Sequence, residues 1–373
     1  MYTNSDPKLF SHVRLACSHG IGPRTRKILL ERFDSPEAIF TASPDELRAV
    51  RGIGKKLAMS VASKQSAIAA EKTIRLCENK GITILVEGDP EYPNLLSQIE
   101  DPPGILFTRG SLEHRPCLAI VGSRHATAYG LRMAEKLASD LVQIGYTVVS
   151  GLARGIDAAA HRGAIRAGGH TIAVLGNGIL SIYPPEHTSL ANDVMLCGAI
   201  LSEFPPQSPP SRHTFPQRNR IISGLCLGTI VAQSSPRSGA LITARLASEQ
   251  GREVFAVPGP IDCPVSRGCH ALIRDGAKLV ESVHDVIDEL GPLTKTFTDS
   301  NGRNVRHPAE FNLGPIEQKV IDSLEKYGDS SPVSIDLLVS MTHLPPSQIL
   351  ATISVLEMRK LLSRFPGGYV AKT

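Results

Sequence analysis

The residues best placed to do chemistry lie in four short loops that are rich in glycine and serine. Three of these loops also contain an arginine: Arg124, Arg154 and Arg237. Small residues leave backbone N–H groups uncovered, and those groups, together with a helix N-terminus, hold oxyanions such as phosphate. The pattern predicts a phosphate-binding site formed by Gly122, Ser123, Arg124, Arg154, Gly176, Asn177, Gly178, Arg237, Ser238 and Gly239.

A further pair of basic residues follows the proline-rich stretch 204–216. Arg218 and Arg220 stand on either side of an asparagine at the start of an apolar helix. We expect this pair to lie beside the loops and neutralise phosphates, because a guanidinium grips a phosphate with two N–H groups at once. Capping and ion pairing within the fold is the alternative, and for Arg220 alone the sequence does not decide between the two.

Signs of catalysis are weak. Asp157 and His161 stand four residues apart on one helix face, as in an acid–base pair, half of a metal site or, more commonly, a cap that orders a loop. No second carboxylate and no Cys/His cluster with ligand spacing accompanies them. The loop at Gly122 lacks GxGxxG spacing, and no P-loop string occurs. We therefore expect binding without catalysis, and neither a cofactor nor a metal.

The loops must be positioned by residues 81–292, where short apolar runs alternate with amphipathic segments. This alternation indicates a doubly wound, largely parallel, Rossmann-like α/β sheet. Ligands of such sheets bind beyond the carboxyl ends of the strands, so we expect the loops to converge there. The expected strands are 83–86, 105–108, 118–122, 147–150, 171–175, 199–203, 229–232, 253–257 and 278–280, with helices at 131–144, 157–167, 240–249 and 283–290.

A helical domain is expected at residues 8–80. Gly20–Pro23 and Gly52–Lys56 each match the turn of a helix-hairpin-helix, or SAM-like, domain. Such turns bring backbone N–H groups close to a phosphate, although the same glycines also cap ordinary helix connections. Four basic side chains accompany the two turns: Arg24, Arg26, Lys55 and Lys56.

The C-terminal part of the chain begins with a polar stretch, 293–313, that we expect to be a linker. Residues 314–373 then show three helical segments and a hairpin turned by Gly367-Gly368. This order is typical of a winged helix. The expected helices are 317–327, 334–341 and 347–362, and the expected hairpin strands are 362–365 and 369–372.

Composition favours a nucleic-acid partner bound with little sequence specificity. The net charge of the 373 residues is +4, and residues 1–75 carry 13 basic against 7 acidic side chains. With no Trp and 5% aromatic residues, a base-stacking platform is not expected; phosphate contacts should dominate, with Tyr183 or Phe215 stacking one base. The seven cysteines are scattered, and neither a signal peptide nor a membrane span is evident, so we expect reduced thiols and a cytoplasmic location.

Several motifs between Val121 and Gly259 together resemble the DprA/Smf family of DNA-processing proteins. They are Val121–Arg124, Ser150–Asp157, Ala173–Gly178, Tyr183-Pro184, Leu201–Glu203, Phe215–Gly224, Ser238–Ala244 and Arg252–Gly259. The resemblance implies binding of single-stranded DNA without hydrolysis, protection of incoming DNA in natural transformation, loading of RecA recombinase, and a homodimer formed through the Rossmann-like domain. It assigns the principal DNA contact to Arg124 and the Arg-Asn-Arg motif to Arg218 and Arg220. Where the family often has basic residues, this chain has Pro185, Glu186 and His187.

Two other functions remain open. Nucleotide-monophosphate phosphoribohydrolases have similar loops, but their PGGxGTxxE string is absent from the corresponding region, which ends at Glu249. The winged helix at 314–373 would instead suit a protein that binds double-stranded DNA, although its 6 basic and 6 acidic residues leave it neutral.

Overall fold

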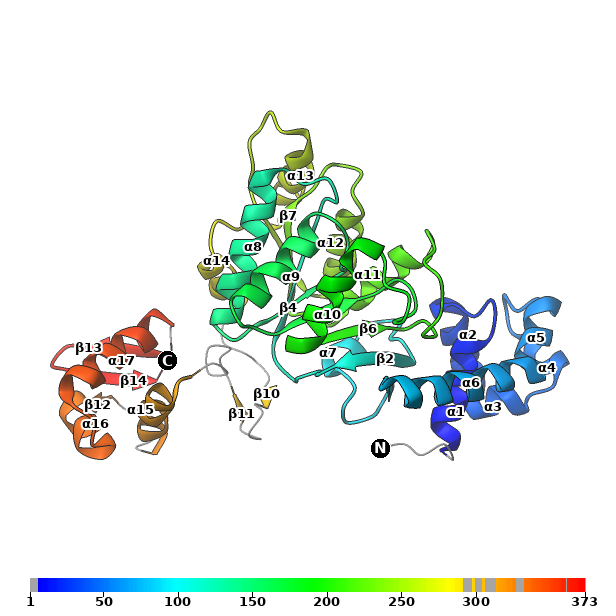
Figure 1. Ribbon diagram of the computed structural model, residues 1–373, viewed down its shortest axis with the longest axis horizontal. Coiled ribbons are helices and arrows are strands. Elements are labelled where there is room, and N and C mark those ends of the chain that lie inside the picture. The colour runs from blue at the N-terminus through cyan, green and yellow to red at the C-terminus, as the bar shows by residue number, and fades with distance from the viewer. Residues whose placement is uncertain are drawn as a thin grey trace.

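The computed structural model describes residues 6–290, 297–298, 304–305, 313–326, 332–359 and 361–372. Figure 1 shows a central sheet domain, a group of helices at its N-terminal end, and a small C-terminal domain of helices and short strands. The expected α/β fold with two flanking domains is confirmed. Among the described residues, no helix is both long enough and apolar enough to cross a bilayer.

Nine strands of the described chain form one sheet in the order β1-β2-β6-β5-β4-β3-β7-β8-β9. Strands β3 to β9 run parallel, whereas β2 is antiparallel to β6 and to β1. The central strands are buried throughout, as strands covered by helices on both faces must be. Each expected strand is present, with its ends within two residues of the prediction: β1 Thr83–Val86, β2 Ile105–Gly110, β3 Cys117–Gly122, β4 Thr147–Ser150, β5 Thr171–Val174, β6 Ala199–Ser202, β7 Gly228–Gln233, β8 Glu253–Ala256 and β9 Lys278–Leu279.

Helices cover both faces of this sheet. Apolar side chains of α8, α9, α10 and α14 pack on one face, and those of α7, α11, α12 and α13 pack on the other. The bounds are α7 Asn94–Ser97, α8 Ala128–Gln143, α9 Ile156–Arg166, α10 Thr188–Cys197, α11 Thr214–Gly224, α12 Gly239–Glu249, α13 Arg267–Arg274 and α14 Val283–Leu290. Sequence patterns missed α7, α10 and α13.

The strand order reverses direction at β3. From β3 the chain proceeds to β4, β5 and β6 on one side and returns to β7 and β8 on the other. The connections that leave β3 and β7 therefore diverge to opposite faces, which opens a crevice at their carboxyl ends. This is where the glycine-rich loops were expected to meet.

The N-terminal helices share a core with the antiparallel edge of the sheet. Leu9 and Val13 of α1 and Ile74 of α6 pack with Ile82 and Phe107. The division into domains at residues 80 and 81 therefore crosses a continuous packed interface, and stays a prediction. The helices are α1 Pro7–Cys17, α2 Pro23–Phe33, α3 Pro36–Thr41, α4 Pro44–Ala49, α5 Lys55–Ala62 and α6 Lys64–Lys80.

The C-terminal domain contains α15 Pro315–Lys326, α16 Ile335–Thr342 and α17 Pro346–Met358. Strands β12 Val333–Ser334, β13 Leu362–Phe365 and β14 Tyr369–Lys372 pair in the order β12-β14-β13. The prediction that the last helix reaches 362 was wrong, because Leu362 already belongs to β13 and is buried beneath the hairpin.

Most of the expected linker, 293–313, lies outside the described residues. Within it, 297–298 and 304–305 are strands β10 and β11, which pair antiparallel. The polar composition of this stretch gave no signal for them.

Candidate nucleic-acid interface

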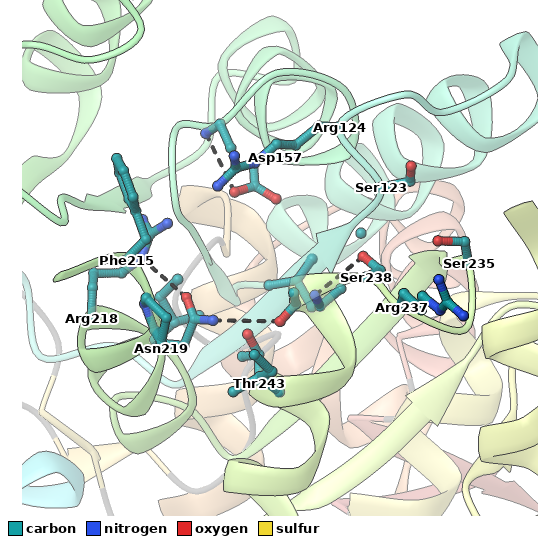
Figure 2. A pocket seen from close by; sticks show the side chains of 18 of the residues that line it. Ser123, Arg124, Asp157, Phe215, Arg218, Asn219, Ser235, Arg237, Ser238 and Thr243 are labelled. Atoms are coloured by element: carbon teal, nitrogen blue, oxygen red, sulfur yellow. Dashed lines mark hydrogen bonds between the residues drawn. The ribbon is translucent and has the colours of Figure 1, made fainter. Parts of the chain in front are cut away.

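A pocket of about 680 Å³ opens at the carboxyl ends of β3 and β7. Figure 2 shows the side chains that surround it, which come from the loops after these strands and from α9, α11 and α12. The charged residues of the described lining are four arginines and one carboxylate, so the pocket is cationic: Arg124, Arg212, Arg218, Arg237 and Asp157.

Seven of the twelve residues expected at the phosphate site line this pocket. They come from three separate parts of the sequence, which the reversal of strand order at β3 brings to one edge of the sheet. They are Gly122, Ser123, Arg124, Arg218, Arg237, Ser238 and Gly239.

Arg124 and Arg237 are the arginines of the predicted set that can reach a ligand in this pocket. Both side chains are exposed, and neither forms an ion pair with another described residue. The guanidinium of Arg124 lies 5.6 Å from the centre of the Phe215 ring, which is in turn 5.6 Å from the ring of Tyr183. Two cations and an aromatic pair therefore face the same cavity.

The N-terminus of α12 lines the pocket. Ser238 caps this helix, and its Oγ accepts a hydrogen bond from the Ala240 N–H at 3.3 Å. A side chain at Gly239 would meet no atom within 4 Å, so the peptide there is open to the cavity. The N–H groups of Ala240 and Leu241 already donate to Ser238, to its Oγ and its carbonyl, so this terminus favours an anion mainly through the positive end of the helix dipole.

Arg218 is a different kind of residue from Arg124, although both line the pocket. Its side chain is only 4% exposed, and its Nη1 donates to the carbonyls of Gly151, at 2.7 Å, and Val174. Burial lowers the pKa of Arg218 to about 10, against the charge of Asp157, so the guanidinium remains protonated at neutral pH. Arg218 ties the loops after β4 and β5 to α11.

The loop after β4 is held in place by three side chains. Besides the Arg218 bond to Gly151, His187 Nδ1 lies 2.9 Å from the carbonyl of Leu152, a residue in the left-handed region with φ of 55°. Asp157 accepts a hydrogen bond from the Ala153 N–H at 3.3 Å. A left-handed leucine is costly, so this conformation depends on such external support.

Asp157 and His161 do not form an acid–base pair. Asp157 caps the loop at Ala153, and burial raises its pKa against the opposing charge of Arg218. His161 is fully buried, its Nδ1 lies 2.8 Å from Thr171 Oγ1, and burial lowers its pKa to about 3. Of the three interpretations weighed from the sequence, the one that fits these contacts is a cap that orders a loop. The described residues contain no metal-binding cluster of His, Cys, Asp and Glu.

The loop after β5 does not reach the main pocket. Asn177 is 1% exposed, and its Nδ2 donates to the carbonyls of Gly178 and Ser181. A Cβ at Gly178 would collide with the carbonyls of Pro205 and Pro206. These residues, with Gly176 packed against Phe215, support the wall of the pocket from behind.

Arg220 also lies away from the pocket. Its guanidinium is paired with both oxygens of Glu203 at 2.7 Å and with Asp101 at 3.1 Å. Burial works against the charge, but these carboxylates outweigh it and raise the pKa of Arg220. Of the two interpretations left open by the sequence, ion pairing within the fold matches this geometry, and we remove Arg220 from the set of candidate ligand residues.

Arg154 occupies the rim. Its side chain is exposed, but Nε and Nη2 both contact Glu186 Oε1 at 2.5 Å. A second, small pocket of about 30 Å³ beside the main one is lined by this arginine together with Arg124, Ala153 and Tyr183.

Sequence reasoning missed five polar residues of the lining, namely His125, Arg212, Asn219, Ser235 and Thr243. Asn219 donates from Nδ2 to the Gly239 carbonyl at 3.4 Å, which joins α11 to the start of α12. The position of Asn219 between two arginines could have indicated that it lines the pocket. Arg212 and Thr243 carried none, because only the tertiary fold brings them to the pocket.

The two helix-hairpin-helix turns differ in their surroundings. Ile21, Gly22 and Pro23 of the first turn line a crevice against residues 102–105 of the sheet domain. Arg26 is paired there with Glu87 and donates to the Pro102 carbonyl at 2.9 Å, so it serves the domain interface. In the second turn Gly54, Lys55 and Lys56 are exposed.

The fold and the pocket define a class of protein, namely one with an extended Rossmann-like domain that has an arginine-lined pocket where its strand order reverses. The family model for DNA recombination-mediator protein A matches residues 83–291, a SAM-like helix-hairpin-helix tandem matches 19–63, and the DprA winged helix domain matches 305–368. The chain belongs to the DprA/Smf family, which confirms the resemblance seen in its motifs.

Relatives and solved structures agree with this membership. Protein Smf of Synechocystis is 34% identical over 93% of this chain and 94% of its own length. The crystal structure of DNA processing protein A from Streptococcus pneumoniae matches with a TM-score of 0.65 at 35% identity, over 77% of this chain and 98% of its own. A structure of DNA processing protein A from Helicobacter pylori, described for its single-stranded DNA binding mode, matches with a TM-score of 0.51 at 28% identity, over 56% of this chain and 95% of its own.

Proposed function

We propose that this protein binds single-stranded DNA in the arginine-lined pocket, without hydrolysing it. The observation that carries the proposal is the convergence of exposed Arg124 and Arg237 with the N-terminus of α12 on one cavity. Phosphodiesters are the ligands that guanidinium groups and helix N-termini have in common. The H. pylori relative, whose structure was described for single-stranded DNA binding, supports the same ligand.

The aromatic pair favours a single strand over a duplex. Phe215 and Tyr183 lie in the wall of the pocket beside Arg124. An unpaired base can stack on such rings, whereas the bases of a duplex are already stacked and paired. Binding that rests on phosphates and one stacked base has little sequence specificity and a marked salt dependence.

A hydrolytic function has less support. The carboxylate in the lining, Asp157, is engaged by the Ala153 N–H, and among the residues that the structure describes no second carboxylate lines the pocket. A general acid–base mechanism needs a titratable group within reach of the substrate, and His161 is buried away from the cavity. Incubation with AMP should therefore release no ribose 5-phosphate.

Double-stranded DNA binding by the C-terminal domain is also less well supported. In many winged helices the third helix enters the major groove, and here α17 contains no lysine or arginine and exposes Leu350 and Met358. Without cations such a helix gains little from phosphates. Unlabelled duplex should compete weakly against a labelled single strand of the same sequence.

Family membership extends the proposal to recombination. We infer that the bound strand is protected and passed to RecA recombinase in natural transformation, which would place the protein in the cytoplasm. We also infer a homodimer through the sheet domain; exposed Ile261, and Leu279 on the edge strand β9, support such a contact. Light scattering coupled to size-exclusion chromatography tests the dimer, and strand exchange in the presence of single-strand-binding protein tests RecA loading.

The direct test replaces Arg124. We expect Arg124→Ala to weaken oligo(dT) binding by roughly tenfold or more, since hydrogen bonds to charged groups contribute about 1.5–3 kcal/mol, while the fold stays intact. The slope of log affinity against log salt should fall by about 0.7, the value for one phosphate contact on a single strand. Arg166→Ala, on the outer side of α9, is the matched control. Equal affinities of the two variants would refute the proposal.

A further inference from the structure

The rim of the pocket carries an ion pair that occupies one of its arginines. Nε and Nη2 of Arg154 both contact the same oxygen, Oε1 of Glu186, at 2.5 Å. The side chains are 55% and 49% exposed, so both groups remain within reach of a ligand. Glu186 follows the aromatic wall residue Tyr183 by three positions, in the short helical turn Pro185–His187.

We propose that Glu186 is a built-in competitor for DNA phosphate at Arg154, which lowers the affinity of the site until a strand displaces it. This proposal rests on the proposed function. A carboxylate and a phosphodiester each carry one negative charge and both accept hydrogen bonds from a guanidinium fork. Glu186 therefore holds the position that a backbone phosphate would take.

The position of Arg154 makes it the next contact along the strand after Arg124. A second, small pocket of about 30 Å³ beside the main one is lined by both arginines together with Ala153, Tyr183 and Phe215, and we take it as an extension of the main pocket because the two share these last three residues and Arg124. A strand whose base stacks on Phe215 or Tyr183 would bring its neighbouring phosphate toward this extension. With Glu186 in place, the guanidinium at that end is already neutralised.

The ion pair is not needed to support the loop that carries Arg154. Three other contacts hold its backbone: Arg218 to the Gly151 carbonyl, His187 to the Leu152 carbonyl, and the Ala153 N–H to Asp157. Removing the charge of Glu186 therefore frees the guanidinium without releasing the loop. The Glu186→Gln variant can therefore distinguish competition for Arg154 from the alternative role of the ion pair, which is to hold the loop in place.

The carboxylate is ionised under the conditions of binding. The pKa of Glu186 lies below its usual value because its own backbone amide, and then Arg154, stabilise the charged form. An exposed pair of this kind contributes little on its own and is screened by salt, so a phosphate fixed by neighbouring contacts can replace it. The competition should be strongest at low salt.

The experiment compares four forms of the full-length protein with the wild type, using fluorescent oligo(dT) at several salt concentrations. Glu186→Gln should bind about two- to fivefold more tightly at low salt, the range expected for an exposed ion pair. Its affinity should fall more steeply with salt than that of the wild type, because the ion pair that the strand must break in the wild type is itself strongest at low salt. The matched control is Glu135→Gln, which removes the same charge from another arginine–glutamate pair, with Arg166, on the outer side of α8 and α9.

Two further variants locate the effect at Arg154. Arg154→Ala should cost little in the wild-type background, and it should cancel the whole gain when combined with Glu186→Gln. Such non-additivity is the signature of a direct coupling between the two residues.

Two results would overturn the inference. Equal gains from Glu186→Gln and Glu135→Gln would mean that only net charge matters, and a loss of affinity in Glu186→Gln would mean that Glu186 orients Arg154 for the strand. Either result leaves the proposed function standing provided that Arg124→Ala weakens binding. If Arg124→Ala has no effect, the proposed function itself fails.

Discussion

Replacing Arg218 by methionine tests whether this arginine is a scaffold or a ligand group. The substitution keeps most of the buried volume and removes the donors to the carbonyls of Gly151 and Val174. Two buried acceptors then lose a charged partner, and Asp157 loses the charge that offsets its burial. Breaking a buried charged network of this kind costs about 3–5 kcal/mol. For a domain of this size, we expect a fall in Tm of roughly 6–20 °C.

The pH dependence of this loss gives a second readout. Burial raises the pKa of Asp157 above its unfolded value, and Arg218 opposes that shift, so Arg218→Met should raise the pKa further. A carboxyl with a raised pKa binds more protons in the folded state, so stability falls as the pH rises above the unfolded value of 3.8. The deficit of Arg218→Met should therefore be smaller near pH 5 than near pH 8.

Thermal unfolding followed by circular dichroism measures both effects, with Arg218→Met/Asp157→Asn as the companion variant. The double variant should recover part of the stability near pH 8 and lose the pH dependence, because the uncompensated charge is gone. A variant with unchanged Tm at both pH values and much weaker DNA binding would refute this reasoning. Arg218 would then be a ligand group rather than a support for the loops.

Two further predictions concern the domain interface and the loop glycines. Burial, and then the charge of Arg26, lower the pKa of His12 to about 4. The neutral side chain therefore stabilises the fold above pH 6.5, and this contribution is lost as the pH falls through 4. His12→Gln should reduce the acid-induced loss of unfolding free energy, measured by urea titration, by about 2–3 kcal/mol. Gly155 has a φ of 75° and a Cβ there would collide with the Ser123 carbonyl, so Gly155→Ala should lower stability by about 1–3 kcal/mol. Gly239 has open space, so Gly239→Ala should change stability by less than about 0.5 kcal/mol in the same titration; equal losses for the two glycine variants would contradict the packing argument.

Much of the sheet could be predicted because its strands carry a strong local signal. A parallel strand covered on both faces is buried along its whole length, and runs of small and β-branched residues such as Thr147–Ser150 and Thr171–Val174 stand out because glycines lie close to both ends. The helices α10 and α13 lack that contrast, since their ends depend on tertiary contacts. The overlong prediction for α17 has the same origin, because the apolar residues Leu361 and Leu362 continue the pattern while the chain turns into a strand.

The candidate site shows where residue types stop being informative. Arg124 and Arg218 are both arginines of short sequence motifs, yet one is exposed and the other forms two buried hydrogen bonds to backbone carbonyls. Arg220 is drawn away by Glu203 and Asp101, and Asp101 lies more than a hundred positions earlier in the chain. No local pattern distinguishes these cases, because each depends on which partner the fold supplies.

Helix α11 explains why Arg218, Asn219 and Arg220 are adjacent although they do different things. Successive residues on a helix point in directions about 100° apart, so three neighbours face three different parts of the molecule. Arg218 meets the loops after β4 and β5, Asn219 meets the start of α12, and Arg220 meets Glu203 and the segment at Asp101. The same segment receives the N-terminal domain, since Arg26 donates to the carbonyl of Pro102. One short helix thus connects the pocket to the surface on which the N-terminal helices dock.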